Sequence, residues 1–403
     1  MDARRQFSYF IPQNGVKKVT LRIPESHSLY ICPAACGRRN GIRAIKNGEK
    51  NRCSFLYIAQ EGLISGAYEE QIGEAVETLL SVLEPRPKAF QLYVNCVDDF
   101  LGTDETALIE ELERRFPERR FLFFHINPVA AEAAVRPGAL MHARLYQFLR
   151  PLGTDNGVNF IGNYASLSPD CELFAIFHRW GLGPVRELCS CKTFAEYMDM
   201  GKSRLNLVLM PMGEYAAKEL RERLGIPYLL QMANYRVNVI RERYAALAEA
   251  LGRPVPDFRA YDEEARSEIA LTGAALSGRK IIVDSSASMC PFALARALLE
   301  YGFEVAAIFA MHSKETDAED EAWLREQHPE TAIVCREGFR DVLGYQFGQD
   351  NLCLGFDSAF LLRARHFVNM YHDEGYYGYR GLCRLMRKMR EALERETEWE
   401  GAE

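Results

Sequence analysis

The chain has 403 residues, of which 48% are hydrophobic and 26% charged, and its formal net charge is −7. This length predicts two or three domains, and the acidic balance argues against a protein whose general partner is nucleic acid. No apolar run approaches the roughly 18 residues that a membrane span needs, and the opening MDARRQFSYF lacks the apolar segment of a secretory signal. We therefore expect a cytoplasmic protein with no membrane partner, whose 11 cysteines are thiols or metal ligands rather than disulfides.

The first third of the chain alternates predicted strands with predicted helices. Helices are expected over 68–83 and 104–116. The apolar, β-rich runs lie at 19–23, 29–32, 55–59, 90–96 and 120–126. Strands that are apolar on both faces and separated by helices are typical of a parallel sheet covered on both sides.

The rest of the chain repeats this alternation twice. A turn-rich PLGTDNG precedes a strand at 158–161, and GRKIIVDSSASMC opens a further strand–turn–helix–strand unit at Gly278. The SSASM turn lacks a Gly-rich phosphate-binding pattern, so we interpret it as a helix cap. We expect an α/β protein of three Rossmann-like domains with parallel sheets flanked by helices, at 1–150, 151–275 and 276–403, the last ending in an amphipathic helix.

Cysteines gather where predicted strands end. Cys32 closes a strand in HSLYICPAACGRRN, Cys36 lies one helical turn further on if 33–39 is helical, and Cys96 closes a buried strand. Ligands of open α/β sheets bind where strands end, and iron–sulfur clusters are held by thiolates from separate segments. From spacing alone, a zinc site and ordinary burial are the alternatives. The Cys189-x-Cys191 pair has no visible third ligand and is interpreted as structural.

Several segments in a fixed order resemble the nitrogenase component 1 family, which includes protochlorophyllide and chlorophyllide reductases, other tetrapyrrole reductases and cluster-assembly scaffolds. The first resembles the His-Gly-Pro-x-x-Cys motif of the family in His27 and Cys32 only. The segments are HSLYIC at 27–32, QLYVNCVDDFLGTD at 91–104, GVNFIGNY at 157–164, LNLVLMP at 205–211, GIPYL at 225–229, GRKIIVDSS at 278–286 and GYYGYRGLCRL at 375–385.

The chain also departs from this family at its cofactor positions. Met210 and Tyr377 fall where the nitrogenase catalytic subunit binds its molybdenum cofactor by Cys and His, and neither side chain replaces those ligands. We therefore expect no such cofactor bound in that manner. The early cluster Cys of the family is missing, because residues 2–26 contain none, and Cys36 and Cys53 are additional thiols that can take its place.

The resemblance implies a divergent nitrogenase-like reductase component, an iron–sulfur oxidoreductase of unknown substrate. An ATP-dependent Fe protein would supply electrons to a 4Fe–4S or larger cluster, and the chain would form a homodimer or pair with a similar component 1 chain. The expected ligands are Cys32, Cys36, Cys53 and Cys96. The candidate catalytic residues, which would line a pocket or supply protons, are Asp98, Asp99, His372 and Tyr377. The alternative is a metallocofactor assembly scaffold without reductase activity.

Overall fold

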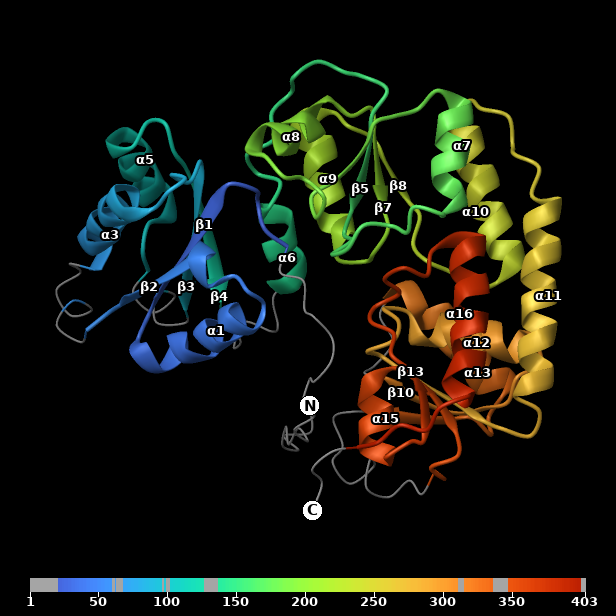
Figure 1. Ribbon diagram of the computed structural model, residues 1–403. Coiled ribbons are helices and arrows are strands. Elements are labelled where there is room, and N and C mark those ends of the chain that lie inside the picture. The colour runs from blue at the N-terminus through green and yellow to red at the C-terminus, as the bar shows by residue number, and fades with distance from the viewer. Residues whose placement is uncertain are drawn as a thin grey trace. The chain divides into compact units, whose positions relative to one another are not determined.

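The computed structural model of the protein describes residues 21–59, 62, 68–95, 98, 102–126, 137–310, 315–335 and 347–399. Three parallel sheets with flanking helices make up these residues, which confirms the predicted α/β class (Figure 1). They form two compact units, described separately below: residues 17–164 with 183–230, and residues 165–182 with 231–403. Each predicted domain range contains one sheet, while the boundaries themselves stay a prediction. Within the described ranges, no helix has the length and apolar character of a membrane span.

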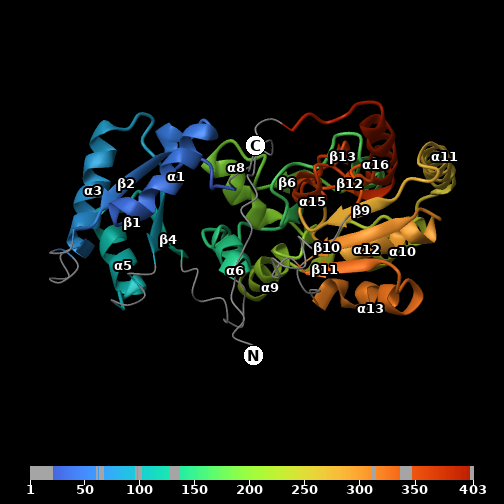
Figure 2. The same cartoon turned by 90° about the horizontal axis from the view of Figure 1, so that it is seen from below.

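The N-terminal sheet contains four parallel strands. Their spatial order is β2 (Cys53–Tyr57), β1 (Ser26–Cys32), β3 (Ala89–Asn95) and β4 (Arg120–Ile126). Its helices are α1 (Ala34–Lys46), α3 (Tyr68–Val82), α5 (Glu105–Arg115) and α6 (Pro137–Arg144), and the 3-10 helix η1 (Lys50–Arg52) leads into β2. Helices α3 and α5 lie on one face, and α1 and α6 lie on the other (Figures 1 and 2).

Alternating strand residues fill the two faces of this sheet, as the period of two requires. Leu29 and Ile31 pack with the apolar residues of α3 and α5. On the opposite face Tyr30 stacks on Tyr93, and Tyr93 stacks on Phe124, each pair with ring centroids 4.8 Å apart. Packing on both faces therefore makes the sheet rigid, so side chains at its carboxyl edge are held in place.

A second sheet belongs to the same unit. It contains β6 (Val185–Glu187), β5 (Val158–Ile161), β7 (Leu205–Val208) and β8 (Tyr228–Leu230) in that order, with α8 (Phe194–Met198), η2 (Asp199–Lys202) and α9 (Gly213–Leu224). Helix α9 begins directly against the end of β5, since a Cβ on Gly213 would lie 2.8 Å from both Gly162 Cα and the Ile161 carbonyl oxygen. Only glycine permits this approach.

The other unit is built on the third sheet. Its strands run in the order β11 (Ala332–Cys335), β10 (Val305–Ala310), β9 (Ile281–Asp284), β12 (Leu352–Leu354) and β13 (His366–Val368). The helices are α7 (Glu172–Trp180), α10 (Val237–Ala250), α11 (Arg259–Ala275), α12 (Pro291–Glu300), α13 (Ala318–Gln327), α15 (Phe356–Leu362) and α16 (Gly378–Leu393), with the 3-10 helix η3 (Glu315–Asp317).

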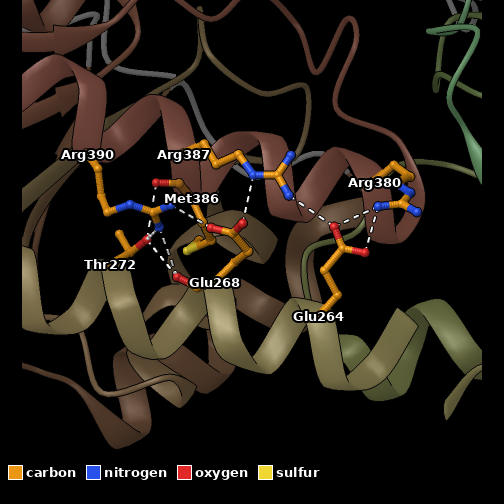
Figure 3. A network of polar contacts seen from close by, with 7 residues as sticks. All are labelled: Glu264, Glu268, Thr272, Arg380, Met386, Arg387 and Arg390. Atoms are coloured by element: carbon orange, nitrogen blue, oxygen red, sulfur yellow. Dashed lines mark hydrogen bonds and ion pairs between the residues drawn. The ribbon is translucent and has the colours of Figure 1, made fainter. Parts of the chain in front are cut away.

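A ladder of ion pairs joins the terminal helix α16 to α11 (Figure 3). Glu264 accepts from Arg380 at 2.6 Å and from Arg387 at 3.0 Å. Glu268 accepts from Arg387 at 2.7 Å and from Arg390 at 2.6 Å. The basic residues that the sequence places on α16 are thus matched by acidic residues of α11, which sit one turn apart on one helix face.

One predicted strand, over 19–23, is wrong for the part of it that the structure describes. Leu21 and Ile23 belong to no strand, although they are only 6% and 0% exposed. Both side chains pack into the hydrophobic cluster that joins the first two sheets, and this packing explains why the segment is apolar. Burial alone therefore produces a pattern that resembles a strand. Residues 19 and 20 lie outside the described part.

Candidate functional site

The carboxyl edge of the N-terminal sheet brings the predicted cluster segments together. Cys32 is the last residue of β1 and is 4% exposed. Its neighbour Ile31 pairs with Val94, so β3 ends at Asn95 on the same edge. The next residue, Cys96, lies outside the described residues.

Helix α1 begins directly after Cys32. Pro33 is its N-cap rather than its first helical residue, the place predicted for it in a helix over 33–39, because its ψ of 147° is extended and the helix begins at Ala34. Cys36 is in the first turn, is exposed, and donates its backbone N–H to the Pro33 carbonyl at 3.0 Å. Burial, and then the charge of Cys36, raise the pKa of Cys32 to about 11. Both thiols belong to the segment where β1 ends and α1 begins, and a metal bound there would displace their protons.

Gly37 keeps the surroundings of Cys32 compact. A Cβ at this position would lie 3.3 Å from Cys32 Sγ and 3.0 Å from ring atoms of both Phe55 and Tyr57. A larger residue would crowd the sulfur atom, so the close approach of α1 to β2 depends on glycine.

Cys53 does not share this edge, contrary to its place in the predicted ligand set. It begins β2 and pairs with Ser28, whereas Cys32 pairs with Tyr57. Four residues along a strand span about 13 Å, so Cys53 and Cys32 lie near opposite ends of their paired strands. The reason is that η1 delivers the chain to the amino edge of the sheet. We therefore omit Cys53 from the ligand set proposed below.

The Asp98 carboxylate is buried and held by hydrogen bonds. It is 5% exposed, and its Oδ1 accepts hydrogen bonds from the Tyr68 hydroxyl at 2.9 Å and the Thr103 hydroxyl at 2.7 Å. Burial and the bond to Asp98 raise the pKa of Tyr68, so the phenol stays a donor. Asp99, the neighbouring candidate, lies outside the described residues.

Three ionisable residues extend this network, and sequence reasoning missed them. His125, near the end of β4, has Nδ1 3.6 Å from Asp98 Oδ2 and Nε2 3.2 Å from Glu105 Oε2. Arg144 of α6 pairs with Glu105, with Nη2 3.2 Å from Oε2. Burial opposes ionisation of Glu105, but its bonds to His125 and Arg144 lower its pKa overall. The one available signal was a histidine closing the buried strand RFLFFHI.

The other two catalytic candidates lie in the unit of the third sheet. Tyr377 is 8% exposed and donates its hydroxyl to Gln231 Oε1 at 3.3 Å; burial raises its pKa, so the phenol is protonated at neutral pH. His372 has a φ of +48° and donates its backbone N–H to the Ser286 carbonyl at 2.9 Å. The catalytic role of these two side chains stays a prediction.

Two sequence motifs have contacts that fit structural roles. After the SSASM turn, the Asp317 carboxylate accepts from the backbone N–H groups of Phe292 and Ala293 at 3.0 and 2.9 Å, and so fills the start of α12 where a phosphate would bind. Cys191 donates to the Glu187 carbonyl at 3.3 Å, on the turn that leaves β6. Across the described ranges, which exclude Cys96, no three His, Cys, Asp or Glu side chains group as a metal site.

Comparisons with known proteins agree with this fold. The model of the family described as nitrogenase component 1 type oxidoreductase matches residues 12–394. The nitrogenase iron-molybdenum cofactor biosynthesis protein NifE of Clostridium pasteurianum is 22% identical over 322 residues, which are 76% of this chain and 69% of the relative. The structure of nitrogenase Cp1 at pH 6.5 has a TM-score of 0.70 at 18% identity, and covers 94% of this chain and 90% of its own. At pH 5 the TM-score is 0.65 at 14% identity, with 94% and 86% covered.

Proposed function

Because this chain belongs to the nitrogenase component 1 type oxidoreductase family, we propose that it is a reductase component that carries a cysteine-bound iron–sulfur cluster. The cluster, 4Fe–4S or larger, receives electrons from an ATP-dependent Fe protein and passes them to a substrate. One observation carries the proposal: Cys32 is buried at the carboxyl edge where β3 also ends, one residue before Cys96. Thiolates from two strand ends are the ligands that such a cluster needs.

The ligand set follows from this edge. Cys32 and Cys96 have counterparts in the family motifs, and Cys36 joins them because it lies in the first turn of α1, which begins directly after Cys32. The start of α1 offers backbone N–H groups and a positive dipole end, which favour thiolate. A homodimer, or a pair with a similar component 1 chain, would allow a further ligand to come from a second chain.

The family's molybdenum cofactor is not part of this proposal. Met210 offers a thioether and Tyr377 a protonated phenol at the two corresponding positions. Neither is a good ligand for the metals that thiolate and imidazole bind. We therefore propose a different substrate or cofactor from that of nitrogenase, with Asp98 as a candidate pocket residue and His372 and Tyr377 as the candidate proton donors.

A second candidate function is the assembly of a metal cluster without reduction of a substrate. The observation that favours it is the similarity to NifE, which is a cofactor biosynthesis protein by its name. The same cysteines would serve either function. Turnover of a small molecule separates the two, since a scaffold would instead transfer its cluster to a cluster-free acceptor.

The test is electron delivery to the reconstituted protein. The chain is purified without oxygen, loaded with iron and sulfide, and mixed with an Fe protein, MgATP and a reductant. We expect an iron–sulfur EPR signal that changes only when MgATP is present, and the non-hydrolysable ATP analogue is the control. If the EPR signal of the loaded protein does not change when the Fe protein and MgATP are added, the reductase proposal is refuted.

A further inference from the structure

The buried carboxylate of Asp98 lies on the edge that the proposed cluster occupies. Cys96 precedes it by two residues in the sequence, a reach of about 7 Å at most. A buried carboxylate is costly unless hydrogen bonds compensate it. Here Tyr68 of α3 and Thr103, from the segment before α5, both donate to the same oxygen at 2.9 and 2.7 Å. The backbone adds a bond from the N–H of Gly102 to the Asp98 carbonyl at 3.0 Å.

The second oxygen of this carboxylate faces His125. The distance from Oδ2 to Nδ1 is 3.6 Å, and the other nitrogen of the ring contacts Glu105, which Arg144 also binds. Donors from α3 and the segment before α5 therefore converge on Asp98. The His125 ring of β4 lies close to the second oxygen, and Arg144 of α6 binds the Glu105 that contacts this ring. Burial, and then the negative charge of Asp98, raise the pKa of Glu69 in the first turn of α3. The charge of Asp98 therefore also acts on a residue to which it is not hydrogen-bonded.

We propose that Asp98 is a positioning residue for the cluster site, held by the hydroxyl groups of Tyr68 and Thr103. This inference rests on the proposed function. The bonded carboxylate fixes a negative charge two residues after Cys96 in the sequence, at the carboxyl edge of the sheet. Residues that orient the ligand segments of a metal site without touching the metal typically change metal affinity by about 10–100-fold when they are replaced. A fixed negative charge also disfavours reduction of a nearby cluster.

Three variants test these two effects. Tyr68→Phe and Thr103→Val each remove one donor and keep the shape of the side chain. We expect each to speed the loss of iron to a chelator by about tenfold. Asp98→Asn removes the charge, and we expect the midpoint potential of the cluster to rise, because the reduced state is more negative than the oxidised state.

The controls are chosen from the same elements. Thr78→Val removes a hydroxyl on the exposed side of α3, where it donates only to the Glu74 carbonyl at 2.9 Å. Asp104→Asn removes the charge of an exposed carboxylate but keeps an oxygen for its cap on the Ala107 N–H. Both should retain iron and keep the potential of the wild type.

A merely structural role would give a different pattern. In that case the three variants would lower the melting temperature of the cluster-free chain but leave the EPR spectrum, iron retention and potential of the loaded chain unchanged, and the inference would be wrong. If the wild type takes up no iron and sulfide at all, the proposed function itself fails, which is a separate result. Iron uptake by the wild type together with control-like behaviour of Tyr68→Phe, Thr103→Val and Asp98→Asn refutes only the positioning role.

Discussion

Gly378, the first residue of α16, should respond sharply to a single added methyl group. Its φ is +67°, and a Cβ there would overlap the Oε1 atom of Glu172. Glu172 is 2% exposed and accepts bonds from the Tyr244 hydroxyl at 2.7 Å and the Tyr379 N–H at 2.6 Å. Gly378→Ala must therefore displace the buried carboxylate that caps this helix.

The cost has two parts. Alanine in the left-handed region costs about 1–2 kcal/mol. Weakening a hydrogen bond to a buried charged group costs about 1.5–3 kcal/mol. We expect Gly378→Ala to lower the free energy of unfolding by about 2.5–5 kcal/mol, a large part of the roughly 5–15 kcal/mol that holds a typical protein folded.

Gly375→Ala is the matched control, three residues earlier in the same segment. Its φ is +82°, but the nearest atom to a Cβ there is Arg384 Nη1, at an ordinary 3.8 Å. This variant should lower the free energy of unfolding only by the backbone term, about 1–2 kcal/mol. Urea unfolding followed by circular dichroism measures both variants. Equal losses at the two positions would refute the reasoning, because the contact with Glu172 would then contribute nothing.

Three further predictions concern stability. Burial raises the pKa of Asp317 to about 7. Between about pH 4 and 7 the folded chain therefore holds a proton on this carboxyl group that the unfolded chain lacks. The contribution of Asp317 to the free energy of unfolding falls by up to about 4 kcal/mol as the pH rises through that window. Asp317→Asn should flatten the pH profile of urea unfolding, and a profile parallel to the wild type would contradict this. Glu268→Gln, which weakens the bonds to Arg387 and Arg390, should cost about 1–2 kcal/mol, whereas exposed Glu263→Gln should change nothing measurable. Gly213→Ala should abolish the native near-ultraviolet spectrum or cost more than about 3 kcal/mol, and a change within 1 kcal/mol would show that α9 can shift.

The sequence predicts the sheets well because their strands are buried on both faces. Runs such as RFLFFHI at 120–126 have apolar residues on both faces, and the helices between them favour parallel connections. The same logic predicts that Cys32 ends a strand, which the structure confirms. It fails at Leu21 and Ile23, where core packing alone produces the apolar pattern.

The sequence predicts only part of the candidate site. Strand register decides that Cys53 begins β2 at the opposite edge from Cys32, and register depends on the turn that precedes the strand rather than on residue type. The contacts of His125 with Asp98 and Glu105 join three segments whose distances no local pattern encodes. Such tertiary contacts appear only once the helices are packed on the sheet.

The most direct measurement of the central claim compares three cysteine variants after anaerobic reconstitution. Iron and sulfide are quantified per chain, and the EPR spectrum is recorded for the wild type, Cys32→Ser, Cys96→Ser and Cys53→Ser. A cluster at the carboxyl edge of the N-terminal sheet predicts that the first two variants lose or alter the signal, while Cys53→Ser keeps the iron content and spectrum of the wild type. Unchanged spectra in both Cys32→Ser and Cys96→Ser would contradict it.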